Sequence, residues 1–284
     1  MDMPPDRWPA IAAARQCSVE RVPFVVDGDM VGSVAAAHID ALAAWPHWIA
    51  AGPAGVCLLA GAADRDTAFA QMNASLRAQG HIVAWRDEAF ALFSPASGAV
   101  LATFERASAR FWGTLTLGAH CNGYVAGAGG RPTHLWIARR SFSKATDPGK
   151  LDNLVGGGVP LGQTPYETLV REGWEEAGLR PEQMQAARAG RVIELEREVP
   201  EGRQRERLHV FDLALPASCQ PCNQDGEVAS LHCLPVEVAI EHAAGDDMTV
   251  DAALATLDFL LRHRLLPPDL HDTIDRRMTG LWVG

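Results

Sequence analysis

The stretch from Gly156 to Leu179 reads GGGVPLGQTPYETLVREGWEEAGL and carries the clearest structural signals of the chain. Thr164 is followed by Glu167 in the pattern of a capping box, and Pro165 stands at the favoured first position of a helix. Gly178 stands where a C-terminal helix cap belongs. These signals predict a helix from Pro165 to Ala177.

Three carboxylates share one face of that helix. Glu172, Glu175 and Glu176 stand at positions i, i+3 and i+4, and like charges this close repel unless something positive lies between them. Taken alone, this pattern favours an ordinary solvated acidic surface. The preceding glycines, Gly156 to Gly158, allow the backbone to approach a ligand closely, and oxygen ligands on a rigid helix suit hard cations. We therefore predict a magnesium site on this helix.

The composition narrows the classes of partner. The chain has 284 residues and a formal net charge of −10, which argues against a protein that wraps nucleic acid but permits a small anionic substrate. No apolar run approaches the ~20 residues that span a bilayer, and Met1 to Pro5 lack the features of a signal peptide. We expect no nucleic-acid partner, no membrane partner, reduced cysteines and a cytoplasmic location.

The apolar periodicity divides the chain into two α+β units with a soft boundary. Residues 1–115 are predicted to form a small α+β domain of unknown role, and residues 116–284 a larger domain. The elements expected in the small domain are a strand, two helices and a hairpin, at Val22–Val26, Val34–Trp45, Thr67–Gln79 and Ala89–Phe93 with Ala99–Phe104. Those expected in the larger domain, besides the helix above, are strands at Thr114–Val125, Thr133–Ala138, Arg191–Val199, Glu206–Leu215 and Val228–Leu234 and a helix at Val250–Leu265.

The acidic helix and its glycines resemble the Nudix box, G-x5-E-x7-R-E-U-x-E-E-x-G-U, in which U is aliphatic. The residues on its fixed positions are Gly157, Arg171, Glu172, Glu175, Glu176, Gly178 and Leu179. The chain departs from the pattern at Gln163, where the first Glu is usual, and at Gly173, where an aliphatic residue is usual. We expect Glu167, four residues before Arg171, to replace the missing charge partner of that arginine.

The resemblance implies a Nudix α/β/α sandwich with a mixed sheet, preceded by the small α+β domain. It implies that Glu172, Glu175 and Glu176 bind Mg²⁺ or Mn²⁺ and that Arg171 orients them. Catalysis is then expected from Glu172 and Arg171 with one carboxylate from outside the box. Glu227, in a turn just before a strand, is the preferred candidate, and an exposed acid without a role is the alternative.

The segments from His134 to Val155 and from Asn223 to Val228 are similar to one Nudix subgroup. Its members carry an N-terminal domain of unassigned function, and a yeast form is fused to thiamin pyrophosphokinase. The resemblance implies a small-molecule diphosphate substrate, namely thiamin diphosphate or its oxidised derivatives, that is hydrolysed to the monophosphate.

Residues of several kinds are candidates for holding such a substrate. Arginine forks and glycine backbone suit phosphate oxygens, and an aromatic wall would suit the ring system. The expected substrate-binding residues are Arg139, Arg140, Lys150, Gly157 and Gly158, and the candidates for the wall are Trp136, Trp112 and Phe142.

Two alternatives for the function remain open. One is a pyrophosphatase of a nucleoside diphosphate derivative such as ADP-ribose, because the residues of the box do not determine which leaving group the substrate carries. The other is a non-catalytic Nudix fold that binds a ligand, although such proteins usually lack the metal glutamates that this chain retains. A homodimer also remains open as the assembly.

Overall fold

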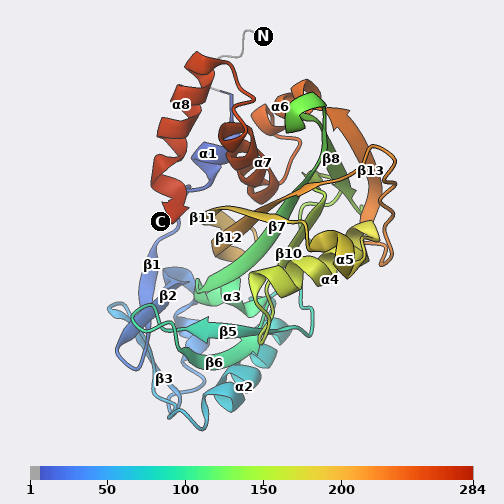
Figure 1. Ribbon diagram of the computed structural model, residues 1–284. Helices are drawn as coiled ribbons and strands as arrows, with labels where there is room; N and C mark the ends of the chain where they lie inside the picture. Colours follow the sequence, from blue (N-terminus) through green and yellow to red (C-terminus); the bar gives the residue numbers. More distant parts are fainter. Residues whose placement is uncertain (1–6, 284) are drawn as a thin grey trace.

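The computed structural model describes residues 7–283, which form a larger and a smaller unit packed together (Figure 1). The larger unit is built on a mixed sheet in the order β13-β8-β7-β12-β11-β14, with β10 paired to β7 and β9 to β8. β7 and β12 run parallel, and the other pairs are antiparallel. The strands are β7 (Leu115–Ala126), β8 (Pro132–Arg140), β9 (Leu151–Asn153), β10 (Val155–Gly158), β11 (Arg188–Val199), β12 (Gly202–Ala214), β13 (Val228–Pro235) and β14 (Trp282–Val283).

Helices cover both faces of this sheet, so the larger unit is an α/β/α sandwich (Figure 1). One face packs against α4 (Pro165–Ala177) and α5 (Pro181–Met184). The other packs against α1 (Pro9–Ala13), α6 (Val236–Ala244), α7 (Val250–Arg262) and α8 (Pro268–Met278). In α7 the leucines at 254, 257 and 261 lie in the core, as their helical spacing predicts. The predicted α+β sandwich with a mixed sheet is confirmed.

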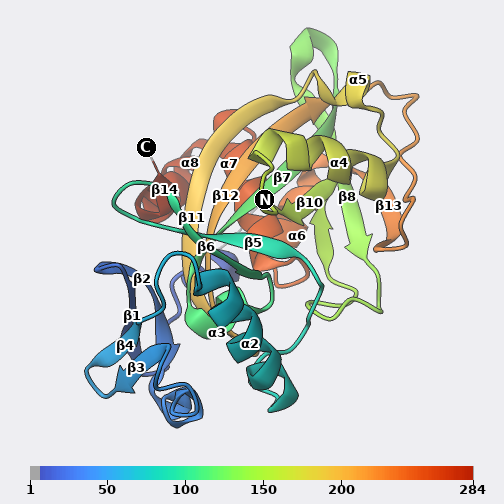
Figure 2. The same ribbon diagram turned by 90° about the horizontal axis from the view of Figure 1, so that it is seen from below.

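The smaller unit has its own core beneath the larger sheet (Figure 2). A four-stranded sheet in the order β2-β1-β4-β3 and the separate hairpin β5-β6 surround Phe24, Phe69 and Trp112, which are fully buried or nearly so. Its elements are β1 (Arg21–Val26), β2 (Asp29–Ala35), β3 (Ile49–Gly52), β4 (Gly55–Leu58), α2 (Arg65–Ala78), β5 (Ala89–Phe93), β6 (Val100–Glu105) and α3 (Ser108–Trp112). The 3₁₀ turns of the chain are Ala36–His38, Asp40–Leu42, Ala128–Gly130 and Thr279–Leu281.

One predicted helix is wrong. Residues 34–45 do not form a helix; β2 continues to Ala35, and two short 3₁₀ turns follow it. The alanine-rich composition favours a helix locally, but Val31 and Val34 are buried in the sheet core, where β2 pairs with β1. Packing of the strand therefore overrides local propensity. The predicted helix at 67–79 and the hairpin around residues 94–98 are confirmed by α2, β5 and β6.

The start of the described chain belongs physically to the larger unit. Trp8 and Ile11 are buried in the core that α7 lines, and the Trp8 backbone N–H donates to the carbonyl of Ala244 at 3.1 Å. The backbone N–H of Glu196 donates to Ala14, and that of Glu198 to Gln16, each at 2.9 Å. The boundary near residue 115 stays a prediction, and residues 8–16 cross it in space.

Within residues 7–283, no helix combines the length and the apolar character needed to cross a bilayer.

Replacing Trp8 by alanine should lower the free energy of unfolding by about 3–5 kcal/mol, as for other buried aromatic residues. Its ring is fully buried, and its Nε1 has no hydrogen-bond partner within residues 7–283, so the loss is one of packing. Trp174 is 49% exposed, and its replacement by alanine should cost about 1 kcal/mol at most. Urea unfolding curves of both variants measure the difference. Equal losses would show that the Trp8 segment adds little to the larger core.

Candidate active site

Helix α4 begins and ends as its sequence signals predict. The Glu167 backbone N–H donates to Thr164 Oγ1 at 3.2 Å, and Glu167 Oε2 accepts from the Thr164 backbone N–H at 2.8 Å. Gly178 ends the helix with a φ of 63°, in the left-handed region that favours glycine. The capping box and the glycine cap fix the helix at Pro165–Ala177.

The three box carboxylates lie in different surroundings. Glu172 and Glu176 are buried, whereas the side chain of Glu175 is 37% exposed. Arg171 donates from Nη2 to Glu172 Oε1 at 2.9 Å and from Nη1 to Glu175 Oε2 at 2.7 Å. Glu176 Oε2 accepts from the Gly156 backbone N–H at 2.8 Å, which ties the helix to β10. Arg171 therefore orients two of the three carboxylates.

The expected pairing of Glu167 with Arg171 is wrong, because the Glu167 carboxylate is held in the capping box. Arg171 instead pairs with Glu172 and Glu175, which follow it one and four residues later in the helix. Gln163 also keeps a contact with the arginine, since its Oε1 accepts from Arg171 Nε at 3.4 Å and from Thr168 Oγ1 at 3.0 Å. The amide thus replaces the usual glutamate without leaving Arg171 unsupported.

Burial puts the site under electrostatic strain. It raises the pKa of Glu172, against the charge of Arg171, and raises the pKa of Glu176 well above its usual range, with Glu172 and Asp152 adding to the effect. Within residues 7–283, no three His, Cys, Asp or Glu side chains are already arranged to hold a metal ion, and Arg171 and Gly156 donate hydrogen bonds to the box carboxylates. Buried, mutually repelling carboxylates nevertheless form an oxygen donor set that fits a hard divalent cation.

Glycines let β10 pass between the acidic helix and a cavity. A Cβ on Gly157 would lie 2.6 Å from Glu172 Cδ, so a side chain there would collide with the box carboxylate. Cβ atoms on Gly156 and Gly158 would lie 2.9 Å from His120 Cε1 and 3.0 Å from Arg106 Cζ. Because alternate residues of a strand face opposite sides, β10 has α4 on one side and the cavity residues on the other.

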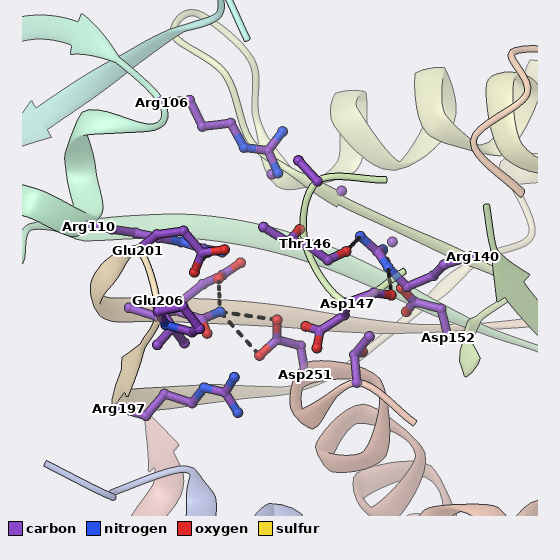
Figure 3. Close-up of a pocket in the computed structure, with 18 of the residues that line it drawn as sticks. Arg106, Arg110, Arg140, Thr146, Asp147, Asp152, Arg197, Glu201, Glu206 and Asp251 are labelled. Atoms are coloured by element: carbon purple, nitrogen blue, oxygen red, sulfur yellow. Dashed lines mark hydrogen bonds and ion pairs between the residues drawn. The ribbon is translucent and has the colours of Figure 1, made fainter. Parts of the chain in front are cut away.

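The cavity has a volume of about 380 Å³, within the range usual for small-molecule sites (Figure 3). Its lining mixes both signs of charge, with residues from both units. The cationic residues are Arg106, Arg110, Arg140 and Arg197, and the acidic ones are Asp147, Asp152, Glu201, Glu206 and Asp251. The lining also includes Gly156 to Gly158, His120 and Gln204.

Most charges of the cavity are paired. Arg140 donates from Nη1 to Asp152 Oδ2 at 2.8 Å and from Nη2 to the carbonyl of Thr146 at 3.0 Å. His120 Nδ1 lies 2.8 Å from Asn153 Oδ1. Arg197 also lines the cavity, and within residues 7–283 its buried Nε has no hydrogen-bond partner. Its guanidinium is therefore a candidate to bind an anion in the cavity.

Comparison with known proteins identifies the family of this chain. The NUDIX domain family matches residues 122–253. A protein of Arabidopsis thaliana described as Nudix hydrolase 20, chloroplastic, is 33% identical over 270 residues, which are 90% of this chain and 71% of that protein. The chain belongs to the Nudix hydrolase family.

The N-terminal part of the chain matches a family of its own. Residues 9–116 match a family described as a domain of unknown function (DUF4743). An uncharacterized protein of Saccharomyces cerevisiae is 32% identical over 200 residues, and the match covers 65% of this chain and 57% of that protein. A crystal structure from Deinococcus radiodurans is 24% identical, with a TM-score of 0.43, and the match covers 61% of this chain and 98% of that one.

This Nudix hydrolase is thus an enzyme that acts on phosphoanhydride bonds, and the non-catalytic alternative is set aside. The plant relatives are named chloroplastic, so the cytoplasmic location stays a prediction.

The structure brings only some of the predicted substrate residues together. Arg140, Gly157 and Gly158 line the cavity. Arg139 donates to the carbonyl of Gly149 at 2.7 Å, and with Lys150 it borders a separate surface hollow. The three aromatic candidates do not line the cavity either: Trp112 and Trp136 are buried in the two cores, and Phe142 is 74% exposed elsewhere. The proposed aromatic wall is not formed.

Glu227 stays a candidate catalytic residue, and the structure shows which cations surround its carboxylate. Its carboxylate is hydrogen-bonded by Lys144 and lies 3.6 Å from Arg86 Nη1. Burial raises the pKa of Glu227, but the hydrogen bond and charge of Lys144, together with Arg86, outweigh burial and leave the pKa lowered. Neighbouring residues hold its turn to the end of α4, since the Gln224 backbone N–H donates to the carbonyl of Glu175 at 2.8 Å. Glu227 is therefore a carboxylate that stays deprotonated near the acidic helix.

Several cavity residues escaped the sequence analysis. These residues come from separate segments and belong to no local motif; they are Arg106, Arg110, His120 and Arg197. Asp152 carried a usable signal, because it is a charged residue inside the short apolar stretch before the glycines, where a buried acid needs a partner.

The glycine at position 173 is explained by α5. A Cβ on Gly173 would lie 2.8 Å from Met184 Sδ, and Met184 is fully buried. Met184 thus fills the space that an aliphatic residue at this box position would occupy. We expect Gly173→Leu to destabilise the protein by about 1–3 kcal/mol and Met184→Ala by about 2–5 kcal/mol. The double variant should lose less than the sum by about 0.5–3 kcal/mol in a double-mutant cycle. Strictly additive losses would contradict this packing.

Glu176 should destabilise the metal-free protein at neutral pH. Its pKa in the folded state is above that in the unfolded chain, so the folded state binds more protons there and stability falls as pH rises past the usual glutamate range, about 4.3. Glu176→Gln keeps an acceptor for Gly156 and removes the buried charge. In chelator-treated protein its melting temperature should exceed that of the wild type at neutral pH, with the difference shrinking toward about pH 4.

The matched control is Glu182→Gln, on the exposed surface of α5, which should shift the melting temperature little. Adding Mg²⁺ should stabilise the wild type more than Glu176→Gln. If Glu176→Gln were less stable than the wild type at every pH, the buried charge would not be the source of the strain.

Proposed function

We propose that this Nudix hydrolase cleaves the diphosphate of a small organic substrate that also carries positive charge, and that thiamin diphosphate or its oxidised derivatives are that substrate. The products are the monophosphate and inorganic phosphate. The observation that carries the proposal is the mixed charge of the cavity next to the glycine strand, which suits a ligand with an anionic and a cationic end.

The anionic end has suitable partners. Arg197 lines the cavity with its guanidinium, and Arg140 lies near the glycine strand with Asp152 holding its guanidinium in place. Arginine forks match phosphate oxygens, and the backbone of Gly157 and Gly158 has no side chains to keep a phosphate away. These residues would bind and orient the diphosphate beside α4.

The cationic end also has partners in the same cavity. Gln204 Nε2 donates to Glu206 Oε2 at 2.8 Å and to Asp251 Oδ2 at 3.1 Å, which brings two carboxylates to one amide. Burial raises the pKa of Glu206, and the neighbouring Asp251 raises it further. Figure 3 shows both acids reaching into the cavity. A cationic heterocycle would relieve the repulsion between these two carboxylates. ADP-ribose has no positive charge with which to do so.

The acidic helix supplies the chemistry. Glu172, Glu175 and Glu176 would hold Mg²⁺ or Mn²⁺, and such a cation neutralises phosphate charge and lowers the pKa of a bound water. Arg171 keeps Glu172 and Glu175 in position through its two Nη atoms. Glu172 or Glu227 accepts the proton of the attacking water, whose oxygen bonds to phosphorus as the bridging P–O bond breaks.

The function is tested by measuring Mg²⁺-dependent hydrolysis of thiamin diphosphate, its oxidised derivatives and ADP-ribose, with identification of the products. Thiamin compounds should give the highest kcat/KM. Glu172→Gln and Glu176→Gln should each lower kcat by about 10²-fold or more, because a carboxylate at the reacting centre is lost. Glu182→Gln serves as the matched control and should keep wild-type rates. A higher kcat/KM for ADP-ribose would overturn the substrate, and unchanged rates in both site variants would overturn the site.

A further inference from the structure

The cavity beside the glycine strand is closed partly by the smaller unit. Arg106 follows β6 and Arg110 lies in α3, and both line the same cavity as Arg140 and Arg197 of the larger unit. We propose that the N-terminal unit forms one wall of the substrate site and that Arg106 and Arg110 bind the diphosphate end of the substrate. This inference rests on the proposed function, and it gives the N-terminal unit a task.

Arg106 lies directly against the Nudix-box strand. Its Cζ would be 3.0 Å from a Cβ on Gly158, so that glycine leaves room for a guanidinium from the other unit. The side chain lies over the ring of Phe90, with Cζ 5.4 Å from the ring centre, and its Nη1 is 2.8 Å from Glu88 Oε2. Phe90 lies under the guanidinium and Glu88 binds one of its nitrogens, while the side chain stays 34% exposed.

Arg110 stands at a tight junction between the units. Its Nη1 donates to Glu201 Oε2 at 2.9 Å across the boundary. A Cβ on Gly202 would lie 2.8 Å from the carbonyl carbon of Arg110, and Gly202 has a φ of 131°, so the β11–β12 turn packs directly on α3. The backbone N–H of Leu161 also donates to the carbonyl of Ala89 at 2.8 Å. The two arginines are therefore fixed relative to the box.

Both arginines retain donors for a ligand. A guanidinium has five N–H groups, and each of these two arginines gives one nitrogen, Nη1, to its carboxylate. The charge of Arg106 also reaches the box, where it opposes the rise in pKa that burial causes at Glu172. Figure 3 shows Arg106 and Arg110 on the side of the cavity opposite Arg140. Arginines on opposite sides of one cavity suit a diphosphate, whose oxygens point in several directions.

The test measures binding of methylenediphosphonate, a diphosphate mimic that is not hydrolysed, to the full chain by titration calorimetry. Arg106→Gln and Arg110→Gln should each weaken binding by about tenfold or more, which is the usual loss for a charge-assisted hydrogen bond. They should raise KM for the diphosphate substrate more than they lower kcat. Arg106→Lys keeps the charge without the fork and should fall between the wild type and Arg106→Gln.

Two variants separate ligand binding from a structural role. Glu88→Gln removes the ion-pair partner of Arg106 and leaves the arginine in place, and it should bind the diphosphonate at least as tightly as the wild type. Arg77→Gln changes an exposed arginine of the same unit that stacks on Trp85, and it should bind with wild-type affinity.

Wild-type diphosphonate affinity in both Arg106→Gln and Arg110→Gln would overturn the inference, as would an equal loss in Glu88→Gln. If Arg106→Gln did not fold, Arg106→Lys and Arg110→Gln would decide. Binding is measured without turnover, so an inactive or differently specific enzyme would overturn the proposed function without touching this result.

Discussion

The site depends on how closely an acidic helix can approach a strand. Gly156 donates its backbone N–H to Glu176, and Gly157 leaves space for Glu172, so two buried carboxylates lie against a bare peptide backbone. No other residue type permits that approach, because any Cβ on Gly157 would collide with the carboxylate. The caps fix the ends of α4, and Met184 packs in the space beside Gly173 on the same helix.

The same strand separates two different electrostatic environments. On the α4 side, negative charge accumulates, and Arg171 and a backbone N–H donate hydrogen bonds to the carboxylates. On the cavity side, arginines from two units face the strand together with acids of their own. Because the strand consists of glycines here, a phosphate in the cavity and a cation at the carboxylates would be separated by little more than a peptide plane. The geometry thus favours a substrate whose phosphate groups supply the negative charge between the arginines and the bound cation.

Local signals were enough for some parts of this arrangement and not for others. The bounds of α4 follow from Thr164, Pro165 and Gly178, because caps act within one turn. The end of β2 could not be read correctly, since pairing with β1 places Val34 and Ala35 in the sheet although the alanine-rich composition favours a helix. Arg106 and Arg197 were invisible for a related reason: they come from distant segments, and only the packing of the two units brings them to one cavity.

The chain contributes to the larger unit at two places. Residues 8–16 pack on α7 and β11 of the larger unit, the chain then builds the smaller unit, and it returns at β7. The larger unit is therefore built from two stretches of the chain, and the smaller unit lies between them in sequence. A fragment beginning at β7 would lose Trp8 and Ile11 from its core and expose an apolar groove on α7. The two units are thus expected to unfold together, because the segment that leads into the smaller unit is part of the core of the larger one.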